Sequence, residues 1–283
     1  MIKLNGTLYR LCLLDTNAVS EIVKNSAGEF ASFSNWSLGH KPFHIPCFSL
    51  FTIIELRRRR DVYDRFLELF SVFPCIILKG HEQLIEDEIA AYPDPSTVNP
   101  VLLGFGGLAL PRDSRLDRAL DAFFSSPSSR ASEERWLAGR LEIVEGITSL
   151  VQNYPPESSA YKPGEIRVFL EMAVFQQIAL HSYSFAKSQV DNGEAVQIDA
   201  FPSLKMTVFT VFYKFYVDNR RLQLSDAFDL VICAPTPYVD AVITERHQAE
   251  VIKKIKTRDS FLKKVAVKTI RDLRNQSDSK GKM

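Results

Sequence analysis

The chain has few cysteines and no long apolar stretch among its 283 residues. Its four cysteines, at positions 12, 47, 75 and 233, form no CxxC pair, which disfavours a zinc ribbon. Each lies in an apolar run, as buried thiols in a reducing compartment do. No apolar stretch approaches the roughly 20 residues needed to span a bilayer, and the N-terminus lacks the apolar core of a secretion signal. We therefore expect a soluble, cytoplasmic protein with no membrane partner.

Neither sign of charge is in large excess, because 35 basic residues stand against 34 acidic ones. The net charge of +1 therefore excludes no class of partner. The distribution is uneven, since residues 253–283 hold 11 Lys and Arg against 3 Asp and Glu, a balance of +8. Such a segment can contact phosphates or can serve solubility alone, and the sequence leaves both open.

Two common nucleotide-binding signatures are missing after the first apolar segment, which ends in Asp-Thr-Asn-Ala-Val-Ser. A dinucleotide site needs GxGxxG there, and a P-loop needs GxxxxGK[ST]. A phosphatase of the haloacid-dehalogenase type needs a second Asp two residues after the first, where this chain has Asn17. These three classes are disfavoured, and the sequence has no internal repeat.

Short apolar segments alternate with helical patterns at both ends of the chain. Expected strands lie at 11–14, 44–48 and 75–78, and the pattern returns after about residue 204 with strands at 238–244 and 264–270. This alternation is typical of an open α/β fold with a central, mostly parallel sheet.

The middle of the chain has a different pattern. Between 93 and 204, breaker-rich stretches separate helical patterns, which predicts a large all-helical insertion. Within it, the glycine-rich segment 101–110 is expected to be a buried loop or, if exposed, a contact patch. The polar and basic segment 271–283 is expected to be a disordered tail.

Acidic residues recur where the expected strands end and helices begin. Ligands of open α/β sheets bind beyond the carboxyl ends of the strands, and acids that converge there repel one another unless a cation is present. Oxygen ligands suit Mg²⁺ or Mn²⁺, which activate water for phosphodiester hydrolysis. Helix capping is the alternative role for several of these acids. The candidate catalytic residues are Asp15, Glu55, Asp226, Asp229, Asp240 and Glu245.

Four segments resemble, in order, the motifs of PIN-domain nucleases. The first, LCLLDTNAVSEI, is an apolar strand closed by Asp-Thr-Asn, and the second, PCFSLFTIIELRR, is a strand, a Ser and a helix with Glu-Leu. The third, LSDAFDLVICA, is an Asp-bearing helix, and the fourth, YVDAVITERH, is a strand that ends in Thr and an acid. The resemblance implies a three-layer α/β/α PIN-like domain built from 1–92 and 205–270, interrupted by the helical insertion 93–204.

The same resemblance implies a magnesium- or manganese-dependent endoribonuclease, with RNA favoured over DNA as the nucleic-acid partner. By position, the metal-binding acids would be Asp15, Glu55 and Asp229, with Asp226 competing for the role of Asp229. The fourth motif departs from the family pattern, because Arg246 stands where its acid usually lies. Either Glu245 or Asp240 would substitute for that acid.

Two further expectations follow from the resemblance. The chain could be a catalytically weak or inactive PIN-like scaffold that binds a protein or RNA through the helical insertion. Many proteins that resemble it are toxins neutralised by a small protein, so an inhibitory protein partner is possible.

Overall fold

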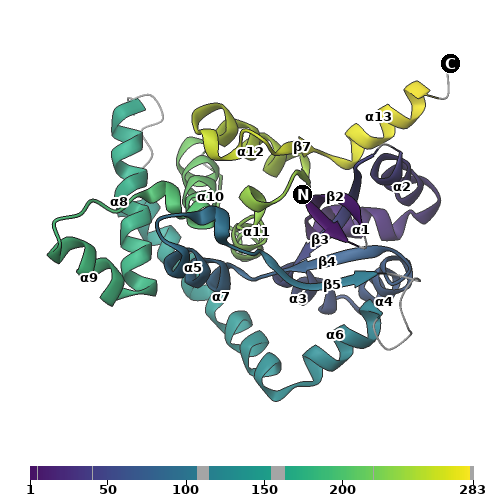
Figure 1. Cartoon of the computed structure of the whole chain (residues 1–283), viewed down its shortest axis with the longest axis horizontal. Coiled ribbons are helices and arrows are strands. Elements are labelled where there is room, and N and C mark those ends of the chain that lie inside the picture. Colours follow the sequence, from purple (N-terminus) through teal and green to yellow (C-terminus); the bar gives the residue numbers. More distant parts are fainter. Residues whose placement is uncertain (5, 40, 107–114, 154–162, 219, 281–283) are drawn as a thin grey trace.

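The computed structural model describes residues 1–4, 6–39, 41–106, 115–153, 163–218 and 220–280. Its centre is a seven-stranded, mostly parallel sheet with the order β5-β4-β3-β2-β6-β7, and β1 pairs with the start of β2 (Figure 1). Among the strands described, only β1 and β5 run antiparallel to their neighbours. The strands are β1 (Ile2–Leu4), β2 (Thr7–Leu14), β3 (Phe43–Ser49), β4 (Pro74–Leu78), β5 (Val101–Gly106), β6 (Ala241–Ile243) and β7 (Ala266–Lys268).

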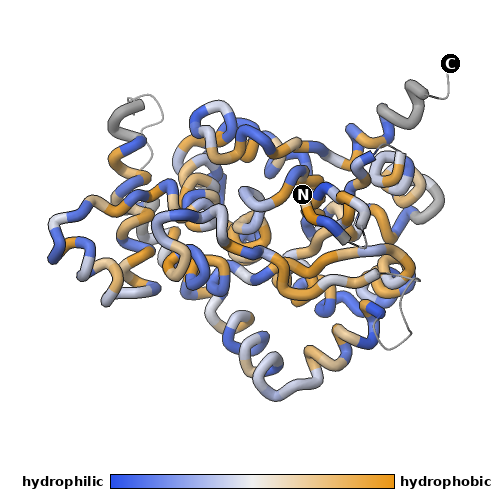
Figure 2. Tube along the Cα trace, in the orientation of Figure 1, coloured by the Kyte–Doolittle hydropathy of each residue, from blue (hydrophilic) through white to orange (hydrophobic). Residues whose placement is uncertain are grey.

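The central strands are apolar on both sides because helices cover both faces of the sheet. Figure 2 shows the strands of the sheet as mostly hydrophobic segments. In β2, Cys12 and Leu14 face one core, whereas Leu11 and Leu13 face the other. Because successive side chains of a strand point to opposite faces of the sheet, β2 contributes residues to both cores.

The first core is formed mainly by helices from the two ends of the chain, together with part of the middle segment. Its helices are α1 (Thr16–Lys24), α2 (Ala31–Leu38), α3 (Leu50–Arg57), α4 (Arg60–Phe70), α6 (Leu116–Ser125), α7 (Pro127–Asn153), α11 (Asp226–Ile232) and α13 (Ile270–Lys280).

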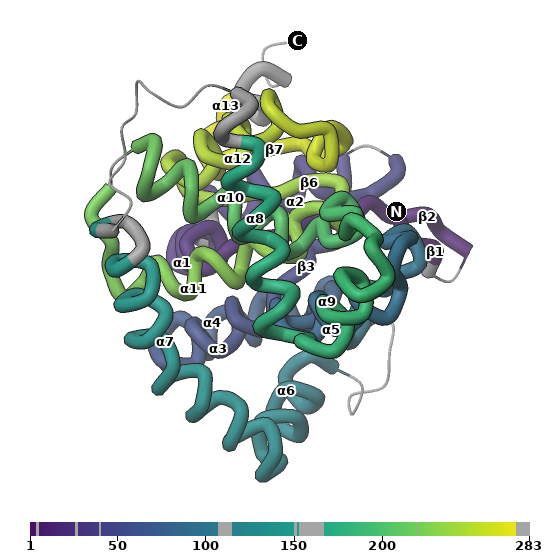
Figure 3. Tube along the Cα trace, turned by 90° about the vertical axis from the view of Figure 1, so that its left-hand side faces the viewer, coloured from purple at the N-terminus to yellow at the C-terminus, as the bar shows by residue number. Residues whose placement is uncertain are grey.

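The second core covers the opposite face of the sheet. Its helices are α5 (His81–Ala91), α8 (Pro163–His181), α9 (Tyr183–Asp191), α10 (Pro202–Val211), the π-helix η6 (Phe212–Val217) and α12 (Arg246–Arg258). Figure 3 shows α8 lying across the outside of α10. None of the helices described is long and apolar enough to cross a membrane.

The connections after β2 and β6 leave the sheet in opposite directions. The helix after β2 is α1, which packs in the first core through Val19 and Ile22, whereas α12 after β6 packs in the second core through Val251 and Ile255. Because β2 and β6 are parallel neighbours, this reversal opens a crevice at their carboxyl ends. The structure is therefore α/β with a mostly parallel sheet, as predicted, and it has the crevice where the sequence places several acids.

Two expectations about the rest of the chain are corrected by the structure. Val101–Gly106 is a strand rather than a loop, and it extends the sheet by pairing with β4, so the segment 93–204 is not all helical as predicted. Residues 107–110 lie outside the described residues. Residues 270–280 form α13 rather than a disordered tail, because Ile270 and Leu273 are buried in the first core. Residues 281–283 lie outside the described range.

Asp240 lies at the wrong end of β6 for a role in the crevice. Its carboxylate accepts a hydrogen bond from the Leu11 amide at 2.8 Å and pairs with the N-terminal amine of Met1 at 3.1 Å. It precedes Thr244 by four residues, or ~13 Å along an extended strand. Asp240 therefore fastens the start of β6 to β2, and the structure separates it from the other acids.

A buried carboxyl group, Glu88 on α5, joins two helical segments of the second core. Its Oε1 accepts hydrogen bonds from the Ser203 amide at 2.8 Å and the Tyr238 hydroxyl at 2.6 Å. Its Oε2 is buried and has no partner among the described residues. Burial raises the pKa of Glu88 to about 7, so the folded state favours its neutral form.

We predict that Glu88→Gln changes the pH dependence of folding. The raised pKa means that the contribution of neutral Glu88 to stability is fully present below about pH 4.5. It is lost between pH 4.5 and about pH 7, where Glu88 ionises in the unfolded chain but stays protonated in the folded one. A neutral Gln removes this loss. The free energy of unfolding of the variant, measured relative to that of the wild type, should therefore increase between pH 5 and pH 8. Urea denaturation at several pH values measures the difference.

The matched control is Glu86→Gln, an exposed residue on the same helix. A stability difference between the Glu88 variant and the wild type that does not change with pH would contradict the prediction.

Candidate active site

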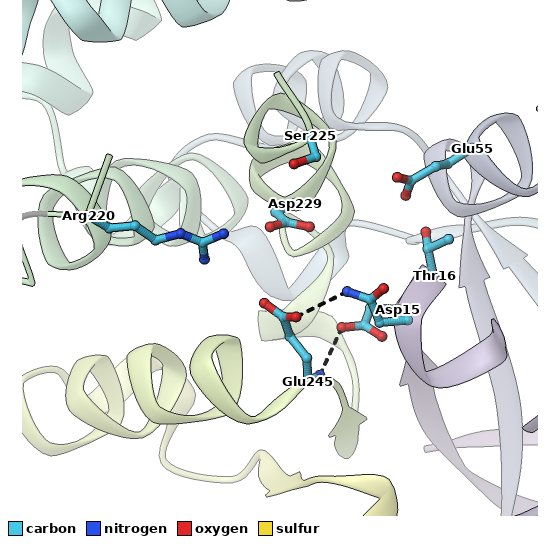
Figure 4. Close-up of a pocket in the computed structure, with 8 residues that line it drawn as sticks. Asp15, Thr16, Glu55, Arg220, Ser225, Asp229 and Glu245 are labelled. Atoms are coloured by element: carbon cyan, nitrogen blue, oxygen red, sulfur yellow. Dashed lines mark hydrogen bonds between the residues drawn. The ribbon is translucent and has the colours of Figure 1, made fainter. Parts of the chain in front are cut away.

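A pocket of about 170 Å³ lies at the carboxyl ends of β2 and β6. Four carboxylates from four separate elements line it (Figure 4). Asp15 follows β2, Glu55 lies on α3, Asp229 lies on α11 and Glu245 follows β6. The remaining lining residues are Thr16, Asn17, Arg220 and Ser225. The chain thus brings together acids from both of its ends.

Asp15 is held from both sides by hydrogen-bond donors. Its Oδ1 caps α1 by accepting from the Ala18 amide at 2.7 Å, and its Oδ2 accepts from the Thr244 hydroxyl and from the Glu245 amide at 3.2 Å. Burial nevertheless raises the pKa of Asp15 to about 7. The carboxylate is well oriented but lacks the water that would stabilise its charge.

Glu55 reaches the pocket because α3 starts directly after β3. Ser49 caps this helix by accepting from the Phe51 amide at 3.3 Å. The flanking Ile54 and Leu56 are buried in the first core, so the helix is held with Glu55 on its pocket side. Burial raises the pKa of Glu55, and the nearby Asp229 carboxylate raises it further.

Asp229 lies on the first turn of α11 and has an internal partner. The ammonium group of Lys214 lies 2.8 Å from its Oδ2, and the Asp229 side chain is 27% exposed. Asp226, one turn earlier, is completely buried. Its carboxylate contacts Lys214 at 3.3 Å and accepts from the Gln223 amide at 2.7 Å, so the structure places Asp226 behind the pocket.

Glu245 is the acid that the fourth motif supplies to the pocket. The Asn17 side-chain amide donates to its Oε2 at 3.2 Å, and its own backbone amide donates to Asp15 (Figure 4). Of the two candidates, Glu245 and Asp240, only Glu245 therefore lies with the other acids. The six predicted residues separate into four that line the pocket and two, Asp226 and Asp240, that do not.

Basic groups surround this acidic pocket. Arg220 lines it and points its guanidinium towards Asp229 and Glu245 (Figure 4). Arg58 and Arg140 lie close enough to Glu55 to lower its pKa, although burial outweighs them. Positive charge on three elements gives the pocket a rim that can attract phosphate.

Helix α7 places Arg140 at this rim. Trp136 packs between the ring of Phe51 on α3 and that of Phe228 on α11, with centroids 4.1 and 6.0 Å away. Glu133 pairs with Arg57 at 3.4 Å, and the Arg140 guanidinium lies over the Phe228 ring. The α7 part of the middle segment therefore packs beside the pocket.

The carboxylates and hydroxyls that line the pocket are oxygen ligands, which suit Mg²⁺ or Mn²⁺ better than zinc. Across the described ranges, no group of three or more His, Cys, Asp or Glu side chains is arranged so that it could hold a metal ion without some movement of the side chains. Mg²⁺ usually keeps several waters and uses one or two carboxylates, which suits an open pocket lined by oxygen ligands. The hydroxyl of Thr16 also lines the pocket, on the side of Glu55, whose pKa it lowers against the larger effect of burial.

Three residues of this site are not identified by the sequence pattern: Thr16, Lys214 and Arg220. Thr16 belongs to the Asp-Thr-Asn segment, which marks only its acid as a site residue, and Arg220 has no distinguishing local pattern. Lys214 does, because it is the only charged residue in the apolar run 206–217. A single lysine in such a run predicts a buried ion pair, since an unpaired buried charge is too costly.

Comparison of the chain with protein-family models, with curated proteins and with solved structures finds no match. The residues of the pocket and their chemistry therefore carry the functional conclusion.

Proposed function

We propose that this chain is a divalent-metal-dependent nuclease, with Mg²⁺ or Mn²⁺ in the pocket of Asp15, Glu55, Asp229 and Glu245. The observation that carries the proposal is the convergence of these four acids, of which Asp15 and Glu55 have raised pKa values. Raised values mean that the protein alone does not stabilise their ionised forms. A bound cation would do so.

We further propose that the fold is a PIN-like three-layer α/β/α domain made of 1–92 and 205–270, with 93–204 as its insertion. The order of the acid-bearing elements and the helices on both faces of the sheet support this proposal. The pairing of β5 with β4 adds an edge strand that the insertion contributes.

The residues of the pocket have distinct roles in this mechanism. A divalent cation supplies water activation and stabilises negative charge on a phosphodiester. Asp15, Glu55 and Asp229 would hold it, and the donors around Asp15 fix the direction of that carboxylate. Glu245 would accept a proton or a water hydrogen bond, since Asn17 orients its Oε2. Arg220 would contact a phosphate oxygen.

RNA is the proposed substrate, because the resemblance of the four motifs favours it. The basic rim of Arg58, Arg140 and Arg220 supports a polyanion of either kind. An inhibitory protein partner stays an expectation from the resemblance.

One observation favours the second candidate, a weakly active or inactive scaffold. Lys214 already neutralises part of the charge of Asp229, at 2.8 Å. A site with less negative charge binds cations more weakly. In addition, α8 exposes apolar side chains, such as Met172 and Leu180, that a partner could cover. Metal titration separates the two candidates.

We predict that Mn²⁺ stabilises the wild type and that Asp15→Asn abolishes this effect. A ligand that binds only the folded state stabilises it by about 2.7 kcal/mol at a concentration 100 times its Kd. The variant removes one charge and little volume, so it should also lose cleavage of single-stranded RNA. Melting temperature with and without Mn²⁺, and gel electrophoresis of labelled RNA, measure the two effects.

The control is Asp240→Asn, the same change at the opposite end of the sheet. It should keep both the Mn²⁺ effect and the cleavage. Full metal protection or full cleavage in the Asp15 variant would contradict the proposed function.

We predict that replacing Arg58 and Arg140 together with Ala weakens RNA binding and leaves Mn²⁺ binding nearly unchanged. The two residues flank Glu55 without lining the pocket. For single strands, the slope of log K against log salt should become shallower by about 0.7 for each phosphate that the variant no longer neutralises. Fluorescence anisotropy at several salt concentrations measures the slope.

Arg135→Ala serves as the matched control, since Arg135 is exposed on the same helix as Arg140. If the double variant binds RNA with the affinity and salt slope of the wild type, the rim has no part in binding.

A further inference from the structure

Lys214 is a fully buried lysine directly behind the acidic pocket. Its side chain is 0% exposed, and its ammonium group lies 2.8 Å from Asp229 Oδ2 and 3.3 Å from Asp226 Oδ1. A buried ammonium group is costly unless it is paired and hydrogen-bonded. The chain therefore supplies it with two carboxylates, of which one also faces the pocket.

Asp226 is committed to this internal charge network. It is 0% exposed, its Oδ2 accepts from the Gln223 amide, and its Oδ1 contacts both Lys214 and, at 3.5 Å, Arg220. Because these donors occupy both oxygens, Asp226 holds Lys214 in place rather than serving the pocket. Asp229 is different, since only its Oδ2 contacts Lys214 and its side chain is part of the pocket wall.

The backbone around Lys214 is also unusual. Residues 212–217 form a π-helix that continues α10, a conformation that is rare and frequent at functional sites. Lys214 lies within this wider turn, and Phe212, Phe215 and Tyr216 around it are buried. The lysine thus lies in an apolar setting, in which its ammonium group is paired with Asp229 and Asp226.

We propose that Lys214 takes the place of a second metal ion, so that the pocket binds a single divalent cation. This inference rests on the proposed metal site. Hydrolytic sites with two metals use shared carboxylates to hold both cations. Here the Lys214 ammonium group contacts Oδ2 of Asp229, and Oδ1 of Asp229 stays available to the pocket. Lys214 is a positioning residue, because it contacts the acid and does not line the pocket.

The test is the number of Mn²⁺ ions bound per chain, measured on the full chain from the electron paramagnetic resonance signal of free Mn²⁺. We expect the wild type to bind one. Lys214→Met should bind a second, because it removes the ammonium group that lies between the carboxylates of Asp226 and Asp229. Lys214→Arg keeps the charge and should bind one, whereas a purely structural role of the lysine would leave one ion in both variants.

A second variant covers the case in which Lys214→Met does not fold. Lys214→Met combined with Asp226→Asn removes both members of the buried pair, a change that is often close to neutral for folding. This double variant should still bind one Mn²⁺. Its affinity should rise about tenfold, since the ammonium group no longer repels the cation.

The outcomes separate the two proposals. Two Mn²⁺ ions in the wild type would overturn the role of Lys214 and leave the proposed function intact. An unchanged or lower affinity in the double variant would overturn it as well, as would a single Mn²⁺ bound by a folded Lys214→Met. Absence of saturable Mn²⁺ binding in the wild type would contradict the proposed function, and the inference about Lys214 with it.

Discussion

The site depends on the parallel pairing of β2 with β6. These strands are more than 200 residues apart in the chain, and their register sets Leu14 beside Ile243. The Asp15 amide donates to the Ile243 carbonyl at 3.2 Å, and the Asp15 carboxylate accepts from Thr244 and Glu245 immediately after β6. A shift of one residue in this register would turn the side chains of β6 to the opposite faces and separate the two acids.

The second constraint on the site is the balance of buried charge. Asp15, Glu55 and Asp229 lie near one another, and burial disfavours the ionised forms of Asp15 and Glu55. The protein offsets part of this cost with Lys214 and Arg220, and it leaves the rest to protonation or to a cation. Burial of these acids therefore costs stability in the free protein, and in the proposed function a bound cation would offset that cost.

Much of this arrangement could be predicted from the sequence, because local patterns encode it. The apolar runs that end at Leu14 and Phe48 predict buried strands, and the acids beyond them predict a crevice. The sequence could not predict that Asp229 lines the pocket and Asp226 does not, since the two acids lie three residues apart on the same helix. It depends on Lys214, whose contacts arise from the packing of a π-helix. Local propensity also missed β5, because its glycines favour a loop until β4 supplies an edge to pair with.

The middle segment is less separable from the sheet than its helical pattern suggests. Trp136 fills the space between Phe51 and Phe228, which belong to the helices that carry Glu55 and Asp229. The distance between these two acids therefore depends in part on a side chain from the middle of the chain. Removal of the Trp136 ring would let α3 and α11 move relative to each other, since a cavity in a packed core is filled only partly by relaxation. Helix α7 of the middle segment thus helps to set the geometry of the pocket as well as its rim.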